Sequence, residues 1–368
     1  MSKAGPARNS LHKVAAIRAS ALIPMLNFAT SSGDAASQSM SRHGFDHSLL
    51  NDPYRVVSLA HYVGLFEDLS KETGEPNLGL KLGMRIRPAD MGPMGVLFSL
   101  SPTMRDGFGR LCTYVRALQG GTYSSFFDVA DNMIWTYRLA DMGLWPRRQD
   151  AEYTMAAVCQ LVRSCFAADW RPVEVHFEHE EEADKALLHR VFRAPVLYGQ
   201  TANRFVVARD DANRIFRSED SGLVAILERH IADLMGETPD IAEETLSERV
   251  RALVAMNLGQ RAVDLASVAR ELGMSPRSLQ RQLLAEGTSM RDVIRSHRVQ
   301  LASRQLGQKR ARIAEVAESL GYADGTVLWR AYKKWTGEGP KAGRLRENAS
   351  DLPEAAPVQG KQEPPDAV

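Results

Sequence analysis

Apolar residues in the first two thirds of the chain follow a helical period in some stretches and a strand period in others. SPTMRDGFGRLCTYVRAL opens with Ser and Thr and keeps its apolar residues on one helical face. TYSSFFDVADNMIWTYRLA is rich in aromatic and β-branched residues, which predicts two strands around a turn at Asp131–Asn132. Further helices are expected over residues 151–167 and 182–192, and strands in RPVEVHFEH and NRFVVARD. Because helices and strands mix without a regular βαβ repeat, residues 11–235 predict an α+β domain.

A final apolar stripe closes this domain. Residues 222–235 predict a helix, and GETPDIAEE after it indicates a linker at residues 236–246. The stripe suits a dimer or interdomain helix, and it equally suits a helix packed on the core of its own domain. Its members are Leu223, Ile226, Leu227, Ile231 and Leu234.

Near the C-terminus one pattern occurs twice, as VARELGMSPRSLQRQL and, 48 residues later, as VAESLGYADGTVLWRAY. In the first copy Asp264 can cap a helix, and Gly273 suits the left-handed position that ends it. Ser275 and Pro276 then begin a second helix, with an expected buried face of Leu279, Leu283 and Leu284. Two short helices joined by a glycine turn predict a helix-turn-helix.

The second copy repeats the arrangement with a turn one residue longer. Gly321 takes the place of the first glycine, and Leu328 and Tyr332 are the expected buried residues. Between the copies, residues 289–306 predict a helix of roughly 27 Å. Such a rod would hold two recognition helices about one DNA turn apart, on the order of 34 Å. The residues 247–346 therefore predict an all-α double helix-turn-helix domain that binds double-stranded DNA.

The distribution of charged residues also separates the C-terminal region from the rest of the chain. Residues 246–346 hold 19 Lys and Arg against 9 Asp and Glu, whereas residues 1–245 hold 26 against 31. A basic module behind a mildly acidic one favours a polyanionic partner. The tail at 347–368 is acidic and Pro-rich, and we expect it and residues 1–10 to be disordered.

Other classes of protein fit poorly. The three cysteines are too few for a disulfide framework or a zinc site, no apolar run approaches a membrane span, and residues 1–33 do not read as a signal peptide. No phosphate-binding or nucleophile motif is visible. We therefore expect a cytoplasmic protein that is not an enzyme and has no cofactor, metal or membrane partner.

Two further stretches carry candidate chemistry. HFEHEEE, residues 176–182, resembles a metal cluster, but a strand edge that enters a solvated acidic turn explains it better. Several aromatic residues suit either a ligand pocket or the core of the hairpin, and the core is the preferred interpretation for most of them. They are Phe126, Phe127, Trp135, Tyr137 and Trp145.

The stretch IAEVAESLGYADGTVLWRAYKKWTGEGPKAGR closely resembles the signature of AraC/XylS-type transcription regulators, and MSPRSLQRQLLAEGTS fits the same family. The stretches GVLFSLSPTMRDGFGRL, DWRPVEVHFEHEEEAD and FRAPVLYGQTANRFVVARD are similar to the ligand-sensing subgroup with an arabinose-binding-like N-terminal domain, which includes ornithine and amine-catabolism regulators. The second resemblance names no ligand and no ligand-binding residue.

The resemblance implies which positions contact DNA. In the first unit these are Arg277, Ser278, Gln280 and Arg281, with Ser278 near a phosphate. Arg pairs well with guanine and Gln with adenine. The second unit departs from the usual polar pattern, because it has glycine and tryptophan at reading positions. Its matching residues are Gly325, Thr326, Trp329 and Arg330, followed by Lys333 and Lys334 as phosphate contacts. For both units a solvated charged helix face is the alternative.

The resemblance implies a transcription regulator, an activator controlled by a small-molecule effector, that works with RNA polymerase as a homodimer. Two alternatives stay open at this point. One is a DNA-targeted enzyme such as an alkyl-transfer repair protein, which needs a reactive cysteine in an electropositive setting. The other is a DNA-binding factor that responds to no ligand.

Overall fold

The computed structural model describes residues 15–141, 143–181, 186–236, 245–258, 263–307, 313–320, 322 and 324–336. By its internal contacts the chain forms two units, Met1–Ile294 and Arg295–Val368. The proposed tails and most of the proposed linker lie outside the described residues.

The N-terminal region of the first unit combines a sheet with helices, as the α+β class predicts. Its helices are α1 (Ile23–Ser31), α2 (Asp34–Arg42), α3 (Leu59–Glu72), α4 (Leu78–Gly83), α5 (Gly92–Leu100), α6 (Met104–Leu118), α7 (Arg148–Cys165), α8 (Ala186–Phe192), α9 (Arg209–Asn213) and α10 (Ser221–Gly236), with the 3-10 turns η1 (Ala19–Leu22), η2 (His47–Asn51) and η3 (Pro88–Met91). The strands are β1 (Ala16–Arg18), β2 (Val56–Ser58), β3 (Thr122–Val129), β4 (Asn132–Leu139), β5 (Glu174–His176), β6 (Val196–Leu197) and β7 (Asn203–Ala208).

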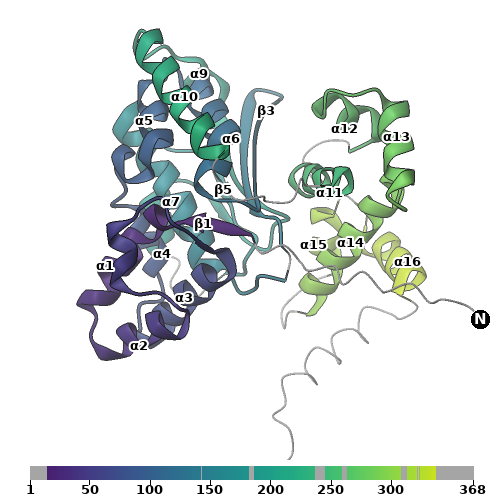
Figure 1. Ribbon diagram of the computed structural model, residues 1–368. Helices are drawn as coiled ribbons and strands as arrows, with labels where there is room; N and C mark the ends of the chain where they lie inside the picture. Colours follow the sequence, from purple (N-terminus) through teal and green to yellow (C-terminus); the bar gives the residue numbers. More distant parts are fainter. Residues whose placement is uncertain are drawn as a thin grey trace, which may run out of the picture. The chain divides into compact units, whose positions relative to one another are not determined.

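The main sheet has the strand order β3-β4-β7-β5-β6, and every pair is antiparallel except β5 with β6. The predicted hairpin is β3–β4. Its turn falls one residue earlier than expected, because Val129 pairs with Asn132 and Ala130 takes a positive φ of 47°. Helices α5, α6 and α7 lie on one side of this sheet (Figure 1).

Strand β4 has two buried faces of different chemistry. Trp135 and Tyr137 face the helices, where the ring of Trp135 lies 5.8 Å from that of Phe108 on α6. Since side chains alternate along a strand, Thr136 and Arg138 point to the opposite face, and both are buried there. The helix-facing residues belong to the main hydrophobic core, as preferred from the sequence.

Arg18, on the short strand β1, joins three segments that are distant in sequence. Its guanidinium donates to the backbone carbonyls of Ala117 at 2.6 Å, Tyr54 at 2.9 Å and Leu234 at 2.6 Å. The last of these carbonyls belongs to α10.

Helix α10 packs largely on its own region. Val224 and Ile231 are buried with Leu97 of α5 and Ala117 of α6. Of the predicted stripe, Leu223 and Ile226 remain exposed, at 39% and 67%. The contacts match the alternative in which the helix covers its own core, and dimerisation through α10 stays a prediction.

Six helices follow. They are α11 (Leu246–Asn257), α12 (Leu265–Glu271), α13 (Pro276–Ala285), α14 (Met290–Gly307), α15 (Ile313–Ser319) and α16 (Gly325–Thr336). Helices α11, α12, α13 and the start of α14 share one small apolar core around Val250, Val268, Leu279 and Val293. Within the first unit, the carbonyl of Leu258 after α11 accepts hydrogen bonds from Thr201 at 3.2 Å and from Arg204 at 3.4 Å.

Candidate nucleic-acid interface

The turn between α12 and α13 is formed by the residues from which it was predicted. The Asp264 carboxylate accepts from the backbone N–H of Ser267 at 2.7 Å and caps α12. Gly273 has a φ of +65°, which a residue with a Cβ adopts only with strain. The Ser275 hydroxyl then accepts from the backbone N–H of Ser278 at 3.1 Å, and Pro276 is the first helical residue of α13.

Helix α13 has one apolar and one polar face. Leu279 and Leu283 are fully buried, whereas Arg277, Gln280 and Arg281 are exposed. Ser278 is half-buried and engaged with Ser275 at the start of the helix.

Leu284 was expected in the buried face, and that prediction is wrong, since its side chain is 73% exposed. Leu279 and Leu283 are four residues apart and lie on one side of the helix, while the next residue is turned about 100° away from that side.

In the second helix-turn-helix, a carboxylate caps the start of α16. Asp324 accepts from the backbone N–H groups of Thr326 at 2.7 Å and Val327 at 2.9 Å. Gly325 lets α16 approach α15 closely, because a Cβ at this position would lie 2.9 Å from Cγ2 of Ile313. Gly325 therefore has a packing role that was not predicted from the sequence, where this glycine was noted only as a position without a side chain to contact bases. Gly321 lies outside the described residues.

The predicted contact residues of α16 share its exposed face. Thr326, Arg330, Lys333 and Lys334 are exposed, and Trp329 is 41% exposed. The Lys333 ammonium lies 5.2 Å from the centre of the Trp329 ring, a cation–π contact that keeps a positive charge over the indole.

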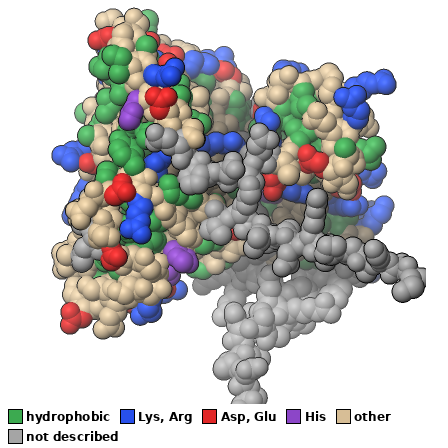
Figure 2. Space-filling view, viewed as in Figure 1, with side chains coloured by type: hydrophobic (Ala, Val, Ile, Leu, Met, Phe, Trp, Pro, Cys, Tyr) green, Lys and Arg blue, Asp and Glu red, His purple; other side chains and the backbone are tan. Residues whose placement is uncertain are grey.

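Opposite this face, Leu328 and Tyr332 are buried as predicted, and the Tyr332 hydroxyl lies 2.9 Å from that of Ser303 on α14. Neither α13 nor α16 contains an acidic residue. Figure 2 shows Lys and Arg side chains at the surface of the helical region after residue 245.

The stretch HFEHEEE matches its sequence interpretation only in part. Glu180 and Glu181 are exposed after strand β5, as expected of a solvated acidic turn, but Glu178 and His179 before them are buried, which corrects the interpretation for these two residues. Glu178 is buried and accepts two hydrogen bonds from Arg147, at 2.6 and 2.8 Å. His179 is also buried, and burial lowers its pKa to about 4, so its imidazole is neutral near pH 7. Its Nε2 lies 3.7 Å from Glu152. No group of residues suited to a metal ion occurs in the described part of the chain.

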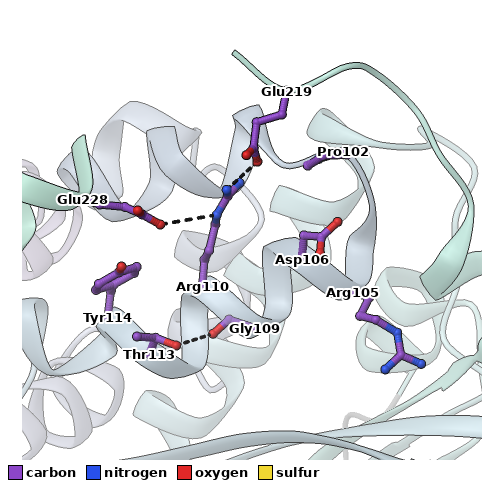
Figure 3. Close-up of a pocket in the computed structure, with 9 residues that line it drawn as sticks. All are labelled: Pro102, Arg105, Asp106, Gly109, Arg110, Thr113, Tyr114, Glu219 and Glu228. Carbon is purple, nitrogen blue, oxygen red and sulfur yellow. Dashed lines mark hydrogen bonds and ion pairs between the residues drawn. The ribbon is translucent and has the colours of Figure 1, made fainter. Parts of the chain in front are cut away.

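An open groove of about 450 Å³ runs along α6 (Figure 3). Arg110 lies between Glu219, with which it forms an ion pair, and Glu228, whose carboxylate is 4.0 Å from its Nε. Because Arg110 is already paired with carboxylates of the groove, it is poorly available to bind an anionic ligand.

The cysteines argue against a thiol-based enzyme. Burial raises the pKa of Cys112 to about 12 and that of Cys159 to about 11, and it also raises the pKa of Cys165. Thiols in this state are poor nucleophiles near pH 7 because they stay protonated.

Comparison with known proteins identifies the two regions. Residues 33–216 match the family described as the N-terminal arabinose-binding domain of AraC transcription regulators, and residues 268–346 match a helix-turn-helix domain. The chain belongs to the AraC family of transcription regulators. The resemblance read from the sequence is thereby confirmed, and the chain is a regulator rather than an enzyme.

Two relatives align along most of this AraC-type chain. The HTH-type transcriptional regulator VirS of Mycobacterium tuberculosis is 26% identical over 288 residues, which are 77% of this chain and 83% of VirS. The ornithine utilization regulator of Pseudomonas aeruginosa is 27% identical over 293 residues, 79% of this chain and 85% of the relative. The crystal structure of the regulator CdpR from Pseudomonas aeruginosa covers 85% of this chain and 98% of its own, at 22% identity and a TM-score of 0.40.

The DNA contacts stay predictions. Of the predicted contact residues, all except the half-buried Ser278 and the packed Gly325 have exposed side chains. In the described part of this AraC-type regulator, no helix combines the length and hydropathy needed to span a bilayer.

Proposed function

We propose that this AraC-type regulator binds double-stranded DNA in a sequence-specific manner and activates transcription when a small effector occupies its N-terminal region. It acts in the cytoplasm as a homodimer and contacts RNA polymerase. One observation carries the proposal: α13 and α16 each combine a buried apolar face with an exposed basic face that has no acidic residue. Such faces attract a polyanion and leave side chains available for base edges.

The two helix-turn-helix motifs have different tasks in this proposal. On α13, Arg277 and Arg281 read guanine, and Gln280 reads adenine, because these side chains match the donors and acceptors of those bases in the major groove. Ser278 lies at the start of α13. Its backbone N–H is used by the Ser275 cap, and its hydroxyl, which accepts from Ser275, can still donate to a phosphate. This unit supplies most of the sequence choice.

The α16 unit supplies affinity more than choice. Gly325 is committed to packing, and Trp329 offers an apolar ring with the Lys333 ammonium over it. Thr326 and Arg330 contact the backbone or a base edge, while Lys333 and Lys334 neutralise phosphates.

Effector control uses the two faces of β4. One face contributes Trp135 and Tyr137 to the interior beside α6, and the other carries Thr136 in a buried polar layer. On that second side, the hydroxyl of Thr201 and the guanidinium of Arg204 bind the carbonyl of Leu258 at the end of α11. A ligand that shifts β4 therefore alters the contacts of the first helix after the linker. An effector that favours one arrangement shifts the population of DNA-competent molecules.

The test is a binding-site profile from genome-wide footprinting, repeated with Arg281→Ala and Lys334→Ala. Arg281→Ala should weaken binding by about 1–3 kcal/mol and relax the base preference at one operator position, because it removes a base contact. Lys334→Ala should weaken all sequences alike. The control is Arg190→Ala, which removes an exposed arginine from α8. If the binding-site profile of Arg281→Ala is unchanged, Arg281 does not contact a base. If the parent protein shows no preference among DNA sequences, the proposed function is wrong.

A further inference from the structure

Leu284 exposes a large apolar side chain on the face of α13 that is proposed to contact DNA. The side chain is 73% exposed. The small core shared by α11, α12, α13 and α14 takes Leu279 and Leu283 from the opposite face of the same helix. Burial in the fold therefore does not account for a leucine at position 284. Single apolar residues are common on protein surfaces, so the place of Leu284 on the helix, and not its exposure alone, carries the inference.

Leu284 lies in the middle of the polar face of α13. It follows Arg277 by seven positions, Gln280 by four and Arg281 by three, and all three of these side chains are exposed. Since an α-helix turns about 100° per residue, Leu284 points about 20° away from Arg277, between the directions of Gln280 and Arg281. A surface that accepts these three polar side chains must therefore also meet the leucine.

The charge of this face favours DNA as the partner of Leu284. Helix α13 contains two arginines and no acidic residue. The first acidic residue after the helix, Glu286, is engaged elsewhere, because its carboxylate accepts from the backbone N–H groups of Leu246 at 3.0 Å and Ser247 at 2.7 Å. An apolar protein surface would desolvate the two arginines without supplying a negative charge, whereas DNA supplies phosphates and base acceptors.

Thymine is the base that offers apolar surface in the major groove. Its C5-methyl group projects there, whereas the purines and cytosine present hydrogen-bond donors and acceptors. A leucine side chain has no donor and no acceptor. It therefore gains from contact with a methyl group and leaves the polar edge of any other base without a partner.

We propose that Leu284 is a specificity-determining residue that contacts the C5-methyl group of a thymine. This inference rests on the proposed function, because it requires α13 to lie in the major groove. At a rise of about 1.5 Å per residue, Leu284 lies roughly 4.5 Å along the axis from Arg281 and roughly 6 Å from Gln280. Base pairs are about 3.4 Å apart, so the thymine lies within about two base pairs of those that Arg281 and Gln280 read.

The test replaces each thymine of the footprinted operator, one at a time, with deoxyuridine, which lacks only the C5-methyl group. The affinity of the full chain for each duplex is measured by anisotropy. One replacement should weaken binding about fourfold, the equivalent of roughly 0.8 kcal/mol for one buried methyl-sized group. That thymine should lie near the position at which Arg281→Ala relaxes the base preference. In Leu284→Ala the same replacement should leave the affinity nearly unchanged, because alanine is too short to reach the methyl group.

The matched control is Gln282→Ala. Gln282 is exposed on the same helix but points about 160° away from Leu284, so this variant should keep the fourfold preference for thymine over deoxyuridine. Leu284→Ala should unfold at the same urea concentration as the parent, since the leucine is largely outside the core. It should also keep the salt dependence of DNA binding, because it removes no charge.

The outcomes separate this inference from the proposed function. If the operator is bound with sequence preference but no thymine replacement weakens binding, the inference is wrong and the proposed function stands. The same holds if Leu284→Ala keeps the preference for thymine over deoxyuridine, or if it weakens binding to both duplexes equally. If no DNA sequence is preferred, the proposed function is wrong and the inference is wrong with it.

Discussion

Asp150 stands on the first turn of α7 with its carboxyl out of water. Burial, opposed by the hydrogen bond from Tyr137 and by the charge of Arg147, raises its pKa to about 7. In the unfolded chain the pKa of an aspartate is about 3.9. The folded protein therefore holds a proton that the unfolded chain releases, and the stability from this proton is present below about pH 4 and lost as the pH rises to about 7.

Asp150→Asn should make unfolding less dependent on pH. At pH 8 the variant should be more stable than the parent by on the order of a few kcal/mol, because it removes a buried charge and its amide oxygen still accepts from Tyr137. Toward pH 5 the difference should narrow. Urea unfolding at both pH values measures this, with Asp169→Asn as the exposed control, and a constant difference across the range would contradict it.

The titratable and charged groups around Asp150 come from several elements, so the measured midpoint belongs to the whole cluster. They are Tyr62 and Glu67 on α3, Tyr137 on β4, Arg147 before α7 and Glu178 after β5.

At the scale of elements, the helix-turn-helix depends on local backbone requirements. Gly273→Ala should lower the free energy of unfolding of the first helix-turn-helix by about 1 kcal/mol, because alanine at a φ of +65° is strained. Gly109→Ala on α6 is the matched control, since its helical backbone accepts a Cβ and nothing lies within 4 Å of it. Thermal unfolding of both variants decides the matter, and equal stability would argue against strain at the turn.

Local signals of this kind could be predicted from the sequence. The caps by Asp264 and Ser275 and the glycine at position 273 act over three or four residues, so their spacing is visible in the chain. The glycine at position 325 escaped this reasoning, because its reason is a contact with Ile313 of another helix.

The interior of the N-terminal region could not be predicted in this way. Arg147 and Glu178 are 31 residues apart and pair only because α7 and the end of β5 meet. Tyr137 was identified as an aromatic pocket or core residue, but nothing in the sequence indicated that Asp150 stands behind it. The packing of α7 against the sheet brought these groups together, and that packing depends on the whole fold.

For the whole molecule, the separation of charge predicts how DNA binding responds to salt. The logarithm of the affinity for DNA should fall linearly with the logarithm of salt concentration, because the Lys and Arg side chains that bind phosphates release counterions from the DNA. Lys333→Ala should reduce the magnitude of this slope by about 1. Anisotropy between 50 and 200 mM salt gives the slope, with Arg190→Ala as the control that keeps it. A flat titration would argue against phosphate contacts.

The position of Arg18 bears on how this protein can be divided. The family match begins at residue 33, so a fragment trimmed to that match would start after the arginine that ties β1 to Tyr54, Ala117 and Leu234. Three buried or half-buried carbonyls would lose the hydrogen bond from Arg18, and α10 would lose the bridge through this arginine to the end of α6. Expression of the sensing region alone should therefore begin no later than residue 15, well upstream of the sequence by which the family is recognised.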